Sequence, residues 1–192
     1  MLKTAMVVGG GHPYFDKRVY LKCVEPLSKI CKEVIYVSAR KRTGQYEVPD
    51  NVVDVFVDNM PIRTVKRTIF WDRVHREVIL SQEPPIDLII LHDIPIGYVF
   101  PNRYVRKLKD KYQSKIIIDL HEYLPETLFP SVPENSLITN INDKMIVDPY
   151  IREADGYVVV SEHGRDYLLK KGIPETNILK SPNYAHTIPN VY

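Results

Sequence analysis

Three successive glycines followed by a histidine, Gly9 to His12, come directly after the apolar run 4–8. Glycine lets backbone amides come close to a diphosphate or a sugar, so Gly10, Gly11 and His12 are candidate substrate-binding residues. A dinucleotide fingerprint beginning at Gly9 would need glycine at position 14, where the chain has Tyr14. The turn therefore disfavours a nicotinamide-dependent oxidoreductase, while a tight turn without any ligand stays an alternative.

Two histidine–acid pairs close two other apolar runs. His92 and Asp93 follow residues 86–91, and His121 and Glu122 follow residues 115–120. The imidazole of a histidine can donate or accept a proton near a sugar hydroxyl, and it can also simply bond neighbouring backbone. His92, Asp93 and Glu122 are candidate substrate-binding residues, although Glu122 is expected to orient its loop or cap a helix rather than act as a base. The spacing matches no standard metal-ligand signature and no cysteine joins the four residues, which argues against a metal site.

Asp16 and Arg18 begin the helical pattern that follows the glycine turn. Asp16 can accept hydrogen bonds from the free amides of the first helical turn, and Arg18 can project towards the strand ends. Both are therefore candidate substrate-binding residues, although capping alone would explain Asp16.

The elements that must position these residues alternate between strands and helices. Several apolar runs are rich in β-branched residues and nearly continuous, as expected of parallel strands covered on both faces. We predict strands over 4–8, 33–38, 52–57, 86–92, 115–120 and 156–161, and helices over 16–31, 63–81, 98–112, 143–153 and 162–171. Pro26 should kink the first helix near Lys22, because proline has no amide hydrogen. The alternation predicts an α/β fold with a doubly wound, Rossmann-like, mostly parallel sheet that has helices on both faces.

Composition narrows the class of protein. With 192 residues, 44% hydrophobic and 26% charged, the chain is expected to form one globular domain. A net charge of +2 is too small to favour nucleic-acid binding, and no apolar stretch approaches the roughly 18 residues of a membrane span. Cys23 and Cys31 are expected on one helix about 12 Å apart, too far for a disulfide. We therefore predict that both cysteines are free thiols, as is usual in a cytoplasmic protein.

Two basic helical stretches, within 62–76 and 103–111, could contact anionic lipid. Their apolar members are equally what a helix covering a sheet must bury, and long cationic side chains commonly solvate its outer face. We therefore expect either a peripheral membrane contact or, more simply, two helices that cover the sheet and carry a solvated basic face.

Taken in order, these motifs resemble the amino-terminal domain of glycosyltransferase family 4. The resemblance is carried by the glycine turn with Asp16-Lys17-Arg18-Val19, by Asp119-Leu120-His121-Glu122 with Pro125-Glu126 after it, and by 154–162. The closing segment 177–183 resembles the strand and asparagine that lead into the family's second domain.

The resemblance implies one half of a GT-B fold, in which two Rossmann-like domains face a cleft. Residues 1–192 would form the acceptor-side domain of a retaining, nucleotide-sugar-dependent glycosyltransferase. His121 would be the catalytic residue facing the transferred sugar, and Gly10 and Gly11 would face the donor diphosphate. No cofactor is implied besides the nucleotide-sugar co-substrate.

The partner implied by the resemblance is a carboxyl-terminal donor-binding domain, in the same chain or a separate one, and this chain without it is expected to be inactive. The acceptor would be a glycan, a lipid or a small molecule. A non-catalytic Rossmann-like binding module or regulatory subunit is the alternative from a different class.

Overall fold

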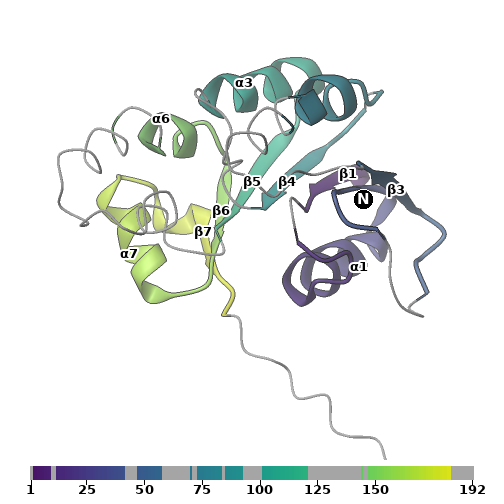
Figure 1. Ribbon diagram of the computed structural model, residues 1–192. Coiled ribbons are helices and arrows are strands. Elements are labelled where there is room, and N and C mark those ends of the chain that lie inside the picture. The colour runs from purple at the N-terminus through teal and green to yellow at the C-terminus, as the bar shows by residue number, and fades with distance from the viewer. Residues whose placement is uncertain are drawn as a thin grey trace, which may run out of the picture.

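A parallel sheet runs through the part of the chain that the computed structural model describes, which comprises residues 2–9, 12–41, 47–57, 70, 73–83, 85–92, 101–120, 144 and 147–182. The strands are β1 (Leu2–Val8), β2 (Cys31–Ser38), β3 (Val52–Phe56), β4 (Leu88–His92), β5 (Lys115–Leu120), β6 (Gly156–Val159) and β7 (Ile178–Lys180). They lie in the order β3-β2-β1-β4-β5-β6-β7, and every neighbouring pair is parallel (Figure 1). The predicted parallel sheet is confirmed.

Helices cover both faces of this sheet. They are η1 (Lys17–Val24), α1 (Glu25–Ser28), η2 (His75–Ile79), α3 (Pro101–Tyr112), α6 (Asp148–Ile151), α7 (Glu162–Lys170) and the short η4 (Glu175–Asn177). Side chains of η1 and α1 pack with β1 and β2 in one apolar core, while those of η2, α3, α6 and α7 share a second core on the opposite face. In Figure 1, α1 and α3 lie on opposite sides of the sheet. The doubly wound arrangement is therefore confirmed.

The strand order reverses between β1 and β4, which are hydrogen-bonded neighbours although β2 and β3 come between them in the chain. In doubly wound sheets, ligands bind at the carboxyl ends of the strands where the order reverses, because the loops diverge there and leave a crevice. The loop after Val8 and the end of β4 at His92 both lie at this edge.

The first helix differs from its sequence-based expectation in form. In η1, a π-helix, the Glu25 amide bonds the Tyr20 carbonyl five residues back. Pro26 then lies in the first turn of α1, where a missing amide hydrogen costs little. The disturbance expected near Lys22 is thus a change from π to α turns after Val24.

The cysteines correct a second expectation, because they do not share a helix. Cys23 lies in η1, whereas the helix ends at Ser28 and Cys31 opens β2, where its side chain is buried in the core beneath α1. Both are free thiols, as predicted.

A capping serine and a glycine fix the two ends of α7. Ser161 Oγ accepts a hydrogen bond from the Gly164 amide at 3.1 Å, as expected for an N-cap. At the other end, Gly172 has a φ of 80°, and the amide of Ile173 bonds the Leu168 carbonyl at 3.1 Å. This is the left-handed ending that favours glycine.

The basic helix α3 covers the sheet with its apolar side. Tyr104, Val105 and Leu108 are buried, while Arg106 Nε donates to Glu153 Oε1 at 2.7 Å. These contacts support the interpretation of α3 as a sheet-covering helix, and contact with a membrane stays a prediction. In the described part of the chain, the helices are too short or too polar to cross a bilayer.

Candidate functional site

The turn after β1 starts at a glycine because there is no room for a side chain. A Cβ at Gly9 would lie 2.7 Å from Tyr36 Cε2 and 3.1 Å from Val19 Cγ1. The Gly9 amide donates to the Val37 carbonyl at 2.9 Å, which extends the sheet into the turn. Gly10 and Gly11, predicted to bind substrate, lie outside the described residues.

An aromatic cluster holds the far end of the same turn. The Tyr36 hydroxyl donates to the Tyr14 carbonyl at 3.1 Å, and the Tyr14 hydroxyl donates to the Asp54 carboxylate. The Tyr14 ring packs edge-on against Phe15 and Tyr36, with centroid distances of 4.7 and 5.1 Å. Burial, reinforced by Asp54, raises the pKa of Tyr14 well above its usual range. Position 14, where a dinucleotide fingerprint needs glycine, therefore serves the core.

Asp16, just before η1, contacts two other predicted site residues, His12 and Arg18. Its Oδ1 accepts hydrogen bonds from the amides of Arg18 and Val19 at 2.8 and 3.3 Å. Its carboxylate also lies 3.8 Å from His12 Nδ1 and 3.6 Å from Arg18 Nε. Burial acts to raise the pKa of Asp16, but the two amide bonds and the charges of His12 and Arg18 outweigh it and lower this pKa. Asp16 is thus a helix cap that also draws His12 and Arg18 together.

His92 meets an acid on the neighbouring strand. His92 and Asp119 are register partners at the carboxyl ends of β4 and β5, and His92 Nδ1 lies 3.1 Å from Asp119 Oδ2. The His92 side chain is fully buried, and that of Asp119 is 13% exposed. A carboxylate on one ring nitrogen fixes the orientation of the imidazole. The pair is therefore a rigid polar feature in the floor of the site.

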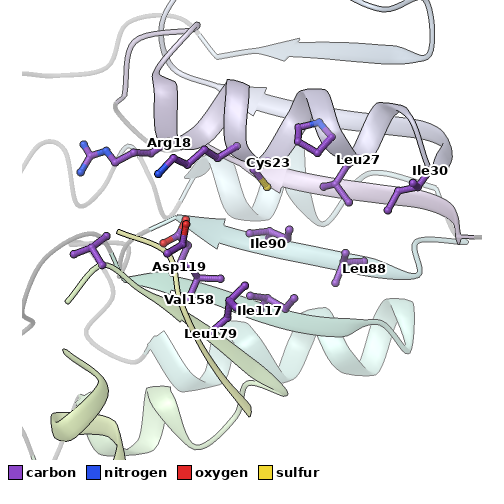
Figure 2. A pocket seen from close by; sticks show the side chains of 14 residues that line it. Arg18, Cys23, Leu27, Ile30, Leu88, Ile90, Ile117, Asp119, Val158 and Leu179 are labelled. Atoms are coloured by element: carbon purple, nitrogen blue, oxygen red, sulfur yellow. The ribbon is translucent and has the colours of Figure 1, made fainter. Parts of the chain in front are cut away.

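A groove of about 300 Å³ begins at Asp119 and runs along the sheet beneath the first helix. Figure 2 shows Cys23, Leu27 and Ile30 along the helix, opposite Leu88, Ile90 and Ile117 on the strands, with Arg18 and Asp119 at one end. Burial, with a smaller contribution from the Asp119 charge, raises the pKa of the Cys23 thiol well above its usual range. Cys23 is therefore a neutral apolar wall residue.

The structure brings together His12, Asp16 and Arg18, and it places Arg18 on the same groove as Asp119. Asp93, His121 and Glu122 lie outside the described residues, so their predicted roles stay predictions.

Sequence reasoning missed two residues of this site. In the sequence, Asp119 stands out only as part of a motif, and Lys22 only as the expected place of a kink, yet both line the groove. Lys22 Nζ donates to the Pro182 carbonyl at 2.7 Å, which ties η1 to the chain beyond β7. The signal for Asp119 was its place next to the last residue of β5, which becomes informative once β4 and β5 are known to be neighbours and the register pairs it with His92 at the end of β4. The signal for Lys22 was its spacing of four residues from Arg18 on the helix.

The described residues contain no cluster of three or more histidine, cysteine or acidic side chains that could hold a metal ion. The chemistry that the described residues make available at this edge is that of two cations and a carboxylate–imidazole pair.

Comparison with known proteins relates the fold to a group of enzymes. No family model and no curated protein matches the sequence. Among solved structures, an α,α-trehalose-phosphate synthase (UDP-forming) from Burkholderia vietnamiensis superposes with a TM-score of 0.51 at 12% identity, covering 89% of this chain and 43% of the synthase. A trehalose-6-phosphate synthase studied with bisubstrate glycomimetics superposes with a TM-score of 0.47 at 12% identity, covering 87% of this chain and 42% of that synthase.

The present chain thus spans less than half the length of these enzymes. At 12% identity, the first likeness shows the fold alone, and it agrees with the Rossmann-like α/β fold predicted from the sequence. It does not distinguish glycosyltransferase family 4 from other families.

Proposed function

We propose that this chain is the acceptor-side domain of a retaining, nucleotide-sugar-dependent glycosyltransferase, with the motif order of family 4. The observation that carries the proposal is the convergence of Arg18 and the His92–Asp119 pair at the carboxyl edge, beside the point where strand order reverses. The likeness of the fold to part of a trehalose-phosphate synthase supports the same reaction class.

Transfer of a sugar breaks the bond between its anomeric carbon and the donor diphosphate, and the electron pair leaves on the phosphate oxygen. The acceptor hydroxyl oxygen forms the new bond, and its proton passes to the oxygen of the departing diphosphate. Backbone amides of the glycine turn and the Arg18 guanidinium would stabilise the charge on the departing diphosphate. His12, held near Asp16, and His121 would contact the reacting sugars.

The His92–Asp119 pair has a supporting role in this scheme. Because His92 is fully buried, it does not reach substrate itself, and the contact of its Nδ1 with Asp119 Oδ2 at 3.1 Å holds the Asp119 carboxylate in place. Asp119, which lines the groove, would then accept a hydrogen bond from an acceptor hydroxyl.

The donor-binding half would come from a partner domain, in the same polypeptide or in a second one. This follows from the proposed GT-B architecture, in which the reaction takes place between two domains, and from the share of the synthase that the chain covers. The domain alone would not turn over a donor.

The test is to purify the gene product from its source cells together with any associated protein, and to incubate it with nucleotide sugars and a cell extract as acceptor. Release of nucleoside diphosphate that depends on the extract is the expected result. Binding of an anion or a protein partner, without diphosphate release from any nucleotide sugar, would contradict the proposal and favour a non-catalytic module.

A further inference from the structure

We propose that the groove between the first helix and the sheet holds the hydrocarbon chain of an anionic amphiphile, whose head group lies at Arg18 and Lys22. Naming this amphiphile as the acceptor rests on the proposed function, whereas the binding itself does not. The acceptor would then be a lipid-like molecule with a single negatively charged head.

The shape and lining of the groove suit an alkyl chain. Its volume of about 300 Å³ is at the lower end of small-molecule sites, which are mostly apolar with a few polar groups at one end. Leu27 and Ile30 form the helix wall, and Ile90, Ile117 and Val158 form the sheet wall (Figure 2). From Leu88 to the level of Asp119 the floor spans four residues of strand, about 13 Å.

The groove walls carry apolar surface that the described residues leave open. Ile30 is 56% exposed and Leu179 is 63% exposed, and both face this one groove. Single exposed apolar residues are ordinary, but two large ones on opposite walls of a groove are the arrangement that burial of a hydrocarbon would stabilise. Within the described part of the chain, η1 and α1 pack on β1 and β2, and the same face of β6 and β7 has no helix over it.

The charges at one end select the head group. Arg18 and Lys22 both line the groove there, together with the single carboxylate of Asp119. Lys22 donates to the neutral carbonyl of Pro182, so its charge is not neutralised by that bond, and Asp119 is directed towards His92 at 3.1 Å. An apolar helix laid over this end would desolvate Lys22 without pairing its charge, and would leave Arg18 with only its contact to Asp16 at 3.6 Å, which is costly. An anionic head satisfies them by charge-assisted hydrogen bonds.

The polar end of the groove also belongs to the candidate site. Arg18 is held beside the capping carboxylate of Asp16 at 3.6 Å, and Asp119 is fixed by His92. A molecule whose chain fills the groove therefore presents its head at the carboxyl edge, where the proposed transfer takes place.

Binding can be measured on this chain with alkyl phosphates of six to fourteen carbons, kept below their micelle concentrations, by isothermal titration calorimetry. Each added CH₂ should strengthen binding by about fourfold until the groove is full, after which affinity should stop rising. Inorganic phosphate and an alkyltrimethylammonium of equal length should each bind at least about tenfold more weakly.

Two variants test the groove walls. Leu179→Asp and Ile30→Asp each put a charge in the groove at an exposed position. Each variant should weaken the binding of dodecyl phosphate by about tenfold or more. Val53→Asp is the matched control, since Val53 is 44% exposed on β3 and does not line the groove. Lys22→Gln should weaken binding several-fold, while Lys29→Gln on the same helical segment should not.

Several results would overturn the proposal. They are affinity independent of chain length, equal affinity for inorganic phosphate, equal loss in Val53→Asp, or binding to phosphatidic acid vesicles without binding of the monomeric alkyl phosphate. A concentration-dependent dimer that Leu179→Asp dissociates would assign the groove to a second copy of the chain instead. Alkyl phosphate binding without sugar transfer by the complete protein would refute only the proposed function, and transfer without such binding would refute only the groove.

Discussion

Gly9 and the ring of Tyr36 lie so close that a methyl group on Gly9 would be 2.7 Å from Tyr36 Cε2. Tyr36 is fully buried on β2, and its hydroxyl is bonded to the Tyr14 carbonyl. The ring therefore supports the glycine turn at its first residue and at its far end. The path of the loop that is proposed to face the donor diphosphate depends on this contact.

Substituting Gly9 by alanine should destabilise the fold. Because Tyr36 is enclosed by the aromatic cluster, it cannot move aside freely, and overpacking of this kind costs about 1–3 kcal/mol. Urea unfolding of Gly9→Ala, Tyr36→Leu and the double variant should show that the two changes are not additive, with the double variant more stable than their sum. The control is Gly164→Ala, where the nearest contact of the new Cβ is 3.4 Å and the helix gains from alanine. If the losses of unfolding free energy in the two single variants add up to the loss in the double variant, Gly9 and Tyr36 are not coupled and the prediction is wrong.

Removing the Asp119 carboxylate should destabilise the sheet edge through His92. Asp119→Ala leaves a fully buried imidazole without its bond to this carboxylate, a loss of about 1–3 kcal/mol. Asp166→Ala, at a side chain that is 59% exposed on α7, should change the free energy of unfolding by less than about 0.5 kcal/mol. Equal effects of the two substitutions in urea unfolding would show that the 3.1 Å pair contributes nothing.

Asp16 should make the fold sensitive to acid. Its pKa is lowered in the folded state, so its contribution to stability is present above the unfolded pKa of about 4 and is lost as the pH falls below that value. Asp16→Ala should cost about 1 kcal/mol at pH 7, as loss of an N-cap does. Asp16→Asn keeps a capping oxygen and should lose less.

Thermal unfolding from pH 7 to pH 3 checks the sign of the Asp16 effect. The stability difference between wild type and Asp16→Asn should shrink as the pH falls. A difference that grows with acid would contradict the lowered pKa.

Alkaline conditions should destabilise the packing of α3. Burial, together with the charge of Glu83, raises the pKa of Tyr112 to about 12, and its hydroxyl donates to the Ile79 carbonyl at 2.6 Å. The neutral phenol is thus favoured by the fold, and its contribution is complete below pH 10 and is lost as the pH rises to about 12. Tyr112→Phe should be less stable at pH 8 by about 1 kcal/mol and should lose less stability than wild type between pH 10 and pH 11. Urea unfolding measures these stabilities. If wild type and Tyr112→Phe lose equal stability between pH 10 and pH 11, Tyr112 is not the cause of the alkaline destabilisation.

The fold was predictable because its signals are local and repeated. Nearly continuous β-branched runs such as 115–120 are typical of strands in a parallel sheet, and the structure places β5 over those same residues. The cap at Asp16 was predictable for the same reason, since donor and acceptor are two or three residues apart.

The site was less predictable, because it depends on contacts distant in sequence. His92 was paired in sequence with its neighbour Asp93, whereas its contact in the structure is Asp119 on the next strand, a relation set by register. Cys31 was placed in a helix by extending a pattern that ends at Ser28. The groove needed two elements to be placed over one another, and no periodicity in the sequence encodes that.

The measurement that tests the central claim most directly is transfer of an isotopically labelled sugar by the complete protein, with the anomeric configuration of the product read by NMR. We predict transfer with retained configuration, reduced about 10²–10³-fold by Arg18→Gln and unchanged by Lys29→Gln, because only Arg18 lies at the candidate site. Transfer that is equally fast in both variants, or no transfer from any nucleotide sugar, would contradict the account.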